Sequence, residues 1–160
     1  MNKKLTHKEG DWFAVPMLKG GYVVGRIARM DKTGKIILGY FFGPRRKKIP
    51  ELDELKNYSP KDAIWVHQFG FLGLKNKEWT VIGSTEPWER EKWPMPAFQM
   101  KDILVDDQYW RIIYSHDDPS KEIKREVVPL EVAKDLPQDG LSGHEAVRIH
   151  LERELSVKNN

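Results

Sequence analysis

The chain contains no cysteine among its 160 residues. This absence excludes disulfide bonds, cysteine nucleophiles and zinc sites with cysteine ligands. No apolar run approaches the roughly 18 residues that a membrane-spanning helix needs. The N-terminal stretch 1–11 also lacks the apolar segment of a secretory signal peptide. We therefore expect a cytoplasmic protein.

Short motifs that usually carry catalysis are also missing. The sequence has no Gly-x-Ser-x-Gly elbow, no glycine-rich phosphate loop ending in Lys-Ser/Thr, and no histidine pair at metal-ligand spacing. The nearest approach to a metal site is His116-Asp117-Asp118, which we interpret as a solvated turn after a strand. His67 lies in an apolar run, typical of a hydrogen-bonded core or interface residue. We predict no catalytic residue, no metal and no cofactor.

The net charge of +3 hides an asymmetry along the chain. Residues 1–50 hold 12 Lys and Arg against 3 Asp and Glu, whereas residues 51–160 hold 15 against 21. Such polarity can mark a surface for an acidic partner. Alternatively, the two halves interleave in space and their fields largely cancel, which is the interpretation we favour.

Aromatic and β-branched runs separated by turn residues dominate the sequence. Strands are expected at 11–18, 22–30 and 35–42, joined by glycine-containing turns at 19–21 and 31–34, and this order indicates a β-meander. Pro16 in the first run suggests an edge position or a bulge. Further strands are expected at 63–74, 78–83, 109–114 and 123–128.

The C-terminal segment changes to a helical pattern. Val147, Leu151 and Leu155 recur one turn apart, and Ser142 with Glu145 forms a capping-box pattern, so 143–156 is predicted to be an amphipathic helix. The expected fold class is α+β: a β-rich, strongly bent antiparallel sheet or small SH3-like barrel with the C-terminal helix packed on it. The length favours a single domain over 1–160, with short disordered ends at 1–8 and 157–160.

A basic run gives one alternative function. Arg45-Arg46-Lys47-Lys48 follows the aromatic residues 40–42, and basic groups beside stacking rings are typical of small barrels that bind single-stranded nucleic acid. The run is short and the later chain is acidic, so a solvated basic loop is the favoured interpretation. Nucleic acid is not the expected partner.

The proline-containing loop 84–98 is the favoured binding segment. Its tryptophans resemble the rigid aromatic anchors that dominate protein interfaces, and nearby carboxylates would steer a partner. The alternative is that both rings fold back to close an open end of the sheet. The predicted partner-binding residues are Trp88, Glu89, Glu91, Trp93, Asp106, Asp107, Asp117 and Asp118.

Several segments together resemble a known family. The opening at 10–17 runs Gly-Asp-Trp-Phe-Ala-Val-Pro-Met, and 21–27 runs Gly-Tyr-Val-Val-Gly-Arg-Ile. This is similar to the opening of the immunity protein 26 family of bacterial polymorphic toxin systems, with Met17 in place of the more usual Leu. Trp93-Pro94-x-Pro96-x-Phe98 and the segment 140–147 resemble the middle and end of the same family. Residues 45–62 carry no pattern that we can place in this family.

The resemblance implies an inhibitor that protects its producer by binding a cognate toxin domain. The same opening also resembles a small class described as an organophosphate hydrolase, so a metal-dependent phosphotriesterase-like activity is the alternative. Such an enzyme normally needs a metal-bound hydroxide, and the missing His-x-His spacing disfavours it. A nuclease inhibitor is commonly acidic, whereas this chain has a pI near 9.0. Either the acidic C-terminal part supplies a local patch or the toxin is not a basic nuclease.

Overall fold

The computed structural model describes residues 6–158 of the chain. Of the ends expected to be disordered, residues 1–5 and 159–160 lie outside this described part. His7 departs from that expectation. It is buried, and its Nε2 lies 3.0 Å from the carbonyl oxygen of Gly34. The N-terminal segment is therefore held against the turn between the second and third strands.

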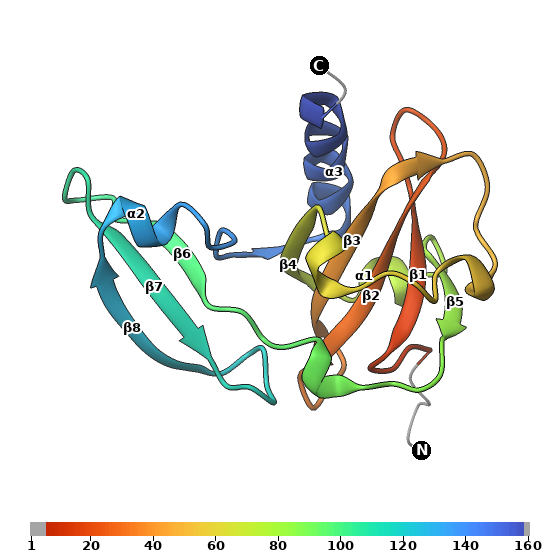
Figure 1. The fold of residues 1–160 in the computed structure, drawn as a ribbon, viewed down its shortest axis with the longest axis horizontal. Coiled ribbons are helices and arrows are strands. Elements are labelled where there is room, and N and C mark those ends of the chain that lie inside the picture. The colour runs from red at the N-terminus through yellow and green to blue at the C-terminus, as the bar shows by residue number, and fades with distance from the viewer. Residues whose placement is uncertain (1–5, 159–160) are drawn as a thin grey trace.

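Six strands form the main sheet, in the order β5-β1-β2-β3-β4-β9 (Figure 1). Neighbouring strands are antiparallel except β4 and β9, which run parallel. The two edge strands, β5 and β9, do not pair with each other, so the sheet is bent but open and not a closed barrel. The strands are β1 Asp11–Pro16, β2 Tyr22–Met30, β3 Ile36–Arg46, β4 Trp65–Gly70, β5 Thr80–Ser84 and β9 Leu141–Ser142.

Both predicted hairpins are confirmed. β1 pairs with β2, and β2 pairs with β3. Gly20, Gly21 and Gly34 take positive φ angles in the connecting turns, which is the conformation that glycine tolerates. β1 is a central strand, but its pairing with β5 stops at Ala14, so Pro16 removes no ladder hydrogen bond to β5.

The main sheet is buried on both faces, because each face carries its own apolar cluster. Ile27 and Phe41 belong to the cluster on one face, together with the C-terminal helix. Ala28 and Phe42, which directly follow them in the chain, belong to the cluster on the other face, together with Trp93. Consecutive residues of a strand point to opposite faces. The near-continuous apolar runs in β2 and β3 therefore supply side chains to the clusters on both faces.

Gly25 permits the close packing of β1 on β2. Phe13 pairs with Gly25 across the two strands, and a Cβ at position 25 would overlap the Phe13 ring. The ring thus occupies the space that the side chain of any residue other than glycine would need.

The predicted C-terminal helix is confirmed as α3 (His144–Lys158). Its stripe of Val147, Leu151 and Leu155 is buried in the cluster on one face of the sheet. The Ser142 hydroxyl, expected to cap this helix, lies 2.7 Å from Nε2 of His67 instead. The strand expected over 63–74 ends at Gly70, and Leu72–Lys75 forms the short helix α1.

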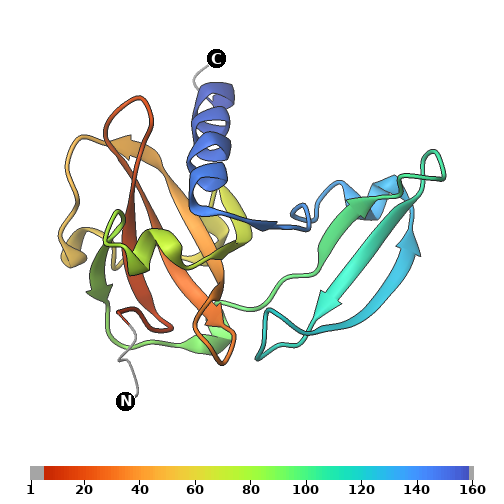
Figure 2. The same ribbon diagram turned by 180° about the vertical axis from the view of Figure 1, so that it is seen from behind.

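Residues 98–133 form a second layer, which we call the arm. It contains the three-stranded antiparallel sheet β6 (Phe98–Lys101), β7 (Tyr109–Tyr114) and β8 (Glu122–Val128), followed by α2 (Leu130–Ala133). β7 and β8 were expected, whereas β6 was not. In both ribbon views the arm extends to one side of the main sheet (Figures 1 and 2).

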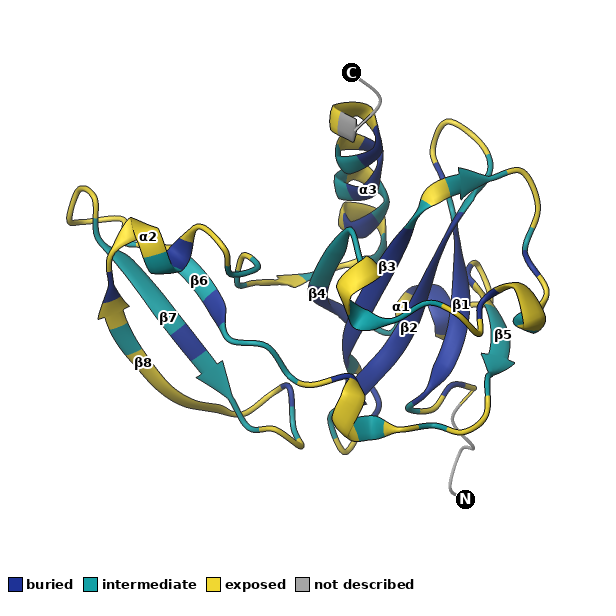
Figure 3. Cartoon of the chain, in the orientation of Figure 1, coloured by how far each residue is buried: buried dark blue, intermediate teal, exposed yellow. Residues whose placement is uncertain are grey.

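Burial follows this division (Figure 3). Strands β1, β2 and β3 of the main sheet are largely buried, whereas the edge strands β5 and β9 and most of the arm are half-buried or exposed. Short 3-10 turns at Leu52–Glu54, Pro60–Asp62 and Arg90–Lys92 cover part of the second cluster. Within residues 6–158, no helix has the length and apolar character needed to cross a bilayer.

Candidate functional site

The predicted binding loop 84–98 contributes to the core. Trp93 is 4% exposed and packs edge-on against Trp12 and Tyr40 at centroid distances of 6.0 and 5.3 Å. Trp88 is half-buried and lies 6.3 Å from Trp93. Trp93 is therefore not an exposed anchor, and the alternative that the rings fold back onto the sheet describes its position. Glu89 and Glu91 of the same loop are exposed.

Arg26 explains why the aromatic rings gather at this place. Its guanidinium carbon lies 5.1, 4.6 and 4.9 Å from the ring centroids of Trp12, Trp88 and Trp93. Cation–π contacts of this kind strengthen when the cation is desolvated. Burial lowers the pKa of Arg26 to about 10, and the side chain remains protonated at neutral pH.

The acids at Asp117 and Asp118 lie in the turn between β7 and β8. Arg90 joins this turn to the N-terminal segment, since its Nη1 lies 2.6 Å from Asp117 and its Nε 2.5 Å from Glu9. The hydrogen bond from Arg90 lowers the pKa of Asp117. Asp118 instead accepts hydrogen bonds from the backbone and hydroxyl of Ser120. The loop 84–98 and this turn therefore adjoin.

Asp106 and Asp107 occupy the opposite end of β7. They lie in the turn between β6 and β7, and Asp107 has a φ of 61°. A six-residue strand separates them from Asp117, so the structure does not bring all the predicted acids together. Partner binding by either group remains a prediction.

The β6–β7 turn carries apolar residues that sequence reasoning missed. Ile103 is 94% exposed and Leu104 is 89% exposed. The Asp102 carboxylate organises the turn because it accepts four hydrogen bonds, two of them from the backbone N–H groups of Leu104 and Val105 at 2.7 and 3.0 Å. The other two come from the side chains of Gln108 and Trp110, each at 2.9 Å. These bonds, led by that from Leu104, lower the pKa of Asp102.

His116 does not form the metal-ligand pattern that its neighbours suggested. Buried Arg29 donates to the His116 carbonyl oxygen at 2.7 Å, and its Nη2 lies 3.2 Å from Nε2 of the same residue. A guanidinium beside the imidazole disfavours a bound cation there. Arg29 also donates to the Trp93 carbonyl oxygen at 3.0 Å and so ties the binding loop to the arm.

A different trio of potential ligands comes together at the start of α3. Atoms of Glu78, His144 and Glu145 lie within 4.8 Å of one another. The guanidinium of Arg148 contacts both carboxylate oxygens of Glu145 at 3.1 Å and competes with a cation for them. These side chains form a network of ion pairs at the protein surface.

The basic run is partly used within the fold. Arg45 pairs with Glu152 of α3 at 2.5 Å, and Arg46 donates to the Tyr58 hydroxyl at 3.1 Å. Lys47 and Lys48 are exposed. Two of the four basic side chains thus hold β3 to its neighbours and are committed to structural contacts.

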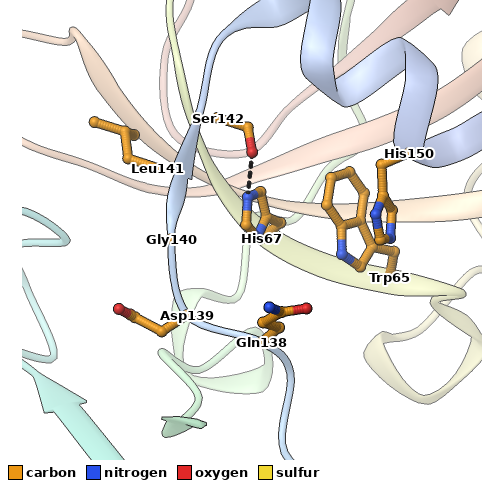
Figure 4. Close-up of a pocket in the computed structure, with 8 residues that line it drawn as sticks. All are labelled: Trp65, His67, Gln138, Asp139, Gly140, Leu141, Ser142 and His150. Carbon is orange, nitrogen blue, oxygen red and sulfur yellow. Dashed lines mark hydrogen bonds between the residues drawn. The ribbon is translucent and has the colours of Figure 1, made fainter. Parts of the chain in front are cut away.

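A polar cavity of about 220 Å³ lies where the chain returns from the arm to α3. Figure 4 shows His67 between Ser142 and Trp65 at its wall. Trp65 stacks on His67 at 4.5 Å and on His150 at 3.9 Å. Burial lowers the pKa of His67 to about 4, with the nearby His150 adding to the shift and the Gln138 backbone opposing it.

This Ser–His pair lacks the third group of a catalytic triad. Nδ1 of His67 is buried without a partner at hydrogen-bond geometry. The carboxylate that lines the cavity, Asp139, instead accepts from the Tyr114 hydroxyl at 2.6 Å. A base with a low pKa and no orienting carboxylate activates a serine poorly. The arrangement is that of a buried structural contact.

Comparison with known proteins identifies the family. A family described as Immunity protein 26 matches residues 8–110, which span the whole meander, the loop 84–98 and the exposed turn of the arm. The match includes residues 45–62, which carry no pattern that we could place, and it ends before the segment 140–147. No curated protein and no solved structure matches the chain. The matched segment is more than half of the 160 residues and carries the Gly10–Met17 and Gly21–Ile27 blocks quoted above. The chain therefore belongs to the Immunity protein 26 family.

Proposed function

We propose that this immunity protein neutralises a cognate bacterial toxin domain by binding it non-covalently, and that the β6–β7 turn of the arm is the centre of the interface. Family membership supports the immunity role. The observation that carries the choice of surface is the exposure of Ile103 and Leu104, which are 94% and 89% exposed. Large side chains exposed to this extent are typical of interaction sites when they cluster.

Exposed apolar side chains concentrate on the arm. Of the eleven large hydrophobic residues that are exposed in the described chain, six lie within residues 98–133. They are Ile103, Leu104, Val105, Ile123, Val127 and Leu130. Most large apolar residues of the main sheet, by contrast, belong to its two clusters. The arm therefore carries the larger share of the apolar surface that a partner could contact in the described chain.

Hydrogen bonds within the turn restrain its backbone in the free protein. Four hydrogen bonds to Asp102 fix the backbone around Leu104 and Val105. Ordering an interface loop in advance reduces the entropy lost on binding. The turn therefore has the properties of a preorganised hydrophobic anchor.

The chemistry of the turn indicates what it would bind. Asp106 and Asp107 directly follow the apolar residues, and both are exposed. An apolar pocket with basic groups on its border would match this surface in both polarity and charge. The acids can steer the encounter, whereas Ile103 and Leu104 supply the desolvated centre.

The proposal is tested by measuring the affinity of Ile103→Ala/Leu104→Ala for the cognate toxin domain. The affinity is expected to fall about 30-fold, which corresponds to about 2 kcal/mol for a hot spot. Leu72→Ala/Ile149→Ala is the matched control, because these residues are 46% and 45% exposed and lie outside the arm. The melting temperature of each variant shows whether folding is retained.

Two outcomes would contradict the proposal. The first is unchanged affinity in the arm variant, and the second is an equal loss of affinity in the control. Titration of toxin activity separately tests binding against catalysis. Protection by a binding protein is complete only at equimolar amounts, whereas protection by an enzyme would need far less immunity protein than toxin.

A further inference from the structure

A second surface feature stands apart from the arm tip. Arg26 of β2 is 5% exposed, so its charge is almost completely withdrawn from bulk solvent. Its Nε donates to the Gly10 carbonyl oxygen at 3.0 Å, and its Nη2 donates to the Thr85 carbonyl oxygen at 3.2 Å. Both acceptors are uncharged, and within residues 6–158 no carboxylate forms an ion pair with Arg26.

Such a charge usually requires a counter-ion. A buried cation is costly unless it is paired, and backbone carbonyls with aromatic faces compensate for only part of that cost. Guanidinium groups carry five donors, and the two hydrogen bonds of Arg26 leave Nη1 without a protein acceptor in the described chain. This residue is therefore equipped to accept an oxyanion.

Arg26 lines a cavity of about 380 Å³, the size of a small-ligand site. Tyr58 and Trp93 supply aromatic walls, and Lys56 and Lys92 supply two further cations at the border. Lys56 pairs with Asp53 at 2.9 Å, and Lys92 pairs with Glu89. Both lysines are exposed, so these pairs are weak and can rearrange around a ligand.

We propose that this cavity binds a small organic oxyanion, whose carboxylate or phosphate group meets Arg26 and whose apolar part lies against Tyr58 and Trp93. Arginine is suited to this role because its planar donors match the geometry of either group. The aromatic walls add contact area that acetate or inorganic phosphate cannot use. This site requires no toxin and is independent of the arm tip.

Two carboxylates act electrostatically on Arg26, those of Glu86 and of the buried Asp11. Of the two, only the exposed Glu86 lines the cavity, so it competes with a ligand for the same cation. A ligand oxyanion would have to compete with the negative charge of Glu86 for the Arg26 guanidinium. Glu86→Gln should therefore strengthen binding, whereas most changes at a cavity border weaken it.

The test uses benzoate and phenyl phosphate as probes, followed by calorimetry and tryptophan fluorescence at low salt. At least one of them is expected to bind saturably, about tenfold more tightly than acetate or inorganic phosphate respectively. Binding of benzoate alone assigns a carboxylate site, and binding of phenyl phosphate alone assigns a phosphate site. Benzamide is the neutral match for benzoate and is expected not to bind.

Variants then locate the site. Lys56→Glu/Lys92→Glu should weaken binding at least about tenfold, whereas Lys32→Glu/Lys121→Glu makes the same change in net charge away from the cavity and should not. These lysines are exposed, so the fold does not depend on them. The proposal is overturned if neither probe saturates by about 10 mM, if benzamide binds as tightly as benzoate, or if both lysine variants lose binding equally.

Discussion

Nε2 of His67 lies 2.7 Å from the Ser142 hydroxyl, and this contact joins β4 to the strand that returns from the arm. Burial lowers the pKa of His67 to about 4, whereas a histidine in the unfolded chain titrates near its ordinary value of 6.5. The folded state therefore favours the neutral ring. Between pH 6.5 and 4 the unfolded chain binds more protons than the folded one, and stability falls as the pH falls.

The first prediction follows from that linkage. The free energy of unfolding should fall by about 2 kcal/mol between pH 7 and pH 5 because of His67 alone. His67→Gln keeps a hydrogen-bonding group near Ser142 but does not titrate, so its pH dependence should be flatter by this amount. Urea denaturation at the two pH values measures the difference. Parallel curves for the variant and the wild type would refute the assignment.

The second prediction separates the two tryptophans of the loop 84–98. Trp93→Ala should destabilise the protein by roughly 3–5 kcal/mol, because the ring fills a buried cluster. Trp88 is half-buried, so Trp88→Ala should cost clearly less. Chemical denaturation of both variants tests the order. If Trp93→Ala unfolds at the same denaturant concentration as the wild type and loses only toxin binding, the assignment of Trp93 to the buried cluster is wrong.

A third prediction concerns the carboxylate that organises the arm turn. Asp102→Ala removes four acceptor contacts, so the amides of Leu104 and Val105 should exchange with solvent at least about tenfold faster. Affinity for the toxin should fall, because the loop must then be ordered on binding. Hydrogen exchange measures the first effect. Asp53→Ala, an exposed acid outside the arm, is the control and should leave exchange in the turn unchanged.

The fourth prediction compares the acids of the β6–β7 turn with the glutamates of the loop 84–98. Asp106→Asn/Asp107→Asn should slow association with the toxin by about five- to tenfold at low salt, and the difference should shrink as salt is added. Asparagine tolerates the positive φ of Asp107, so the turn is retained. Glu89→Gln/Glu91→Gln removes the same charge from the loop 84–98, outside the arm, and should have little effect. Stopped-flow measurements of the association rates test this prediction. A larger effect of the glutamate changes would indicate that the interface lies at the loop 84–98.

The elements that the sequence predicts well have strong local signals. The hairpins around β2 rest on glycines whose positive φ angles the structure shows, and α3 rests on the buried stripe of Val147, Leu151 and Leu155. Local pattern did not reveal that Phe41 and Phe42 are both fully buried. That outcome depends on a second layer, supplied by segments far along the chain.

The candidate surface was harder to predict for the same reason. Ile103 and Leu104 have the composition of a core segment, and only the tertiary arrangement leaves them exposed. Trp93 is of a residue type that is typical of interface anchors, yet it packs against Arg26 and Tyr40 in the second cluster. The separation of Asp106 from Asp117 could have been predicted, because a strand between two turns places them at opposite ends.

The arm is fastened to the main sheet on both of its connections. On the entering side, Arg29 holds the Trp93 carbonyl, and the Tyr40 hydroxyl donates to the Pro94 carbonyl at 2.5 Å. On the returning side, β9 pairs with β4. The β7–β8 turn supplies a further attachment, because Arg29 donates to the His116 carbonyl oxygen and Arg90 pairs with Asp117. Both this turn and the entering connection lie at the end of β7 opposite to the β6–β7 turn. A partner that contacts the β6–β7 turn would therefore leave these attachments intact.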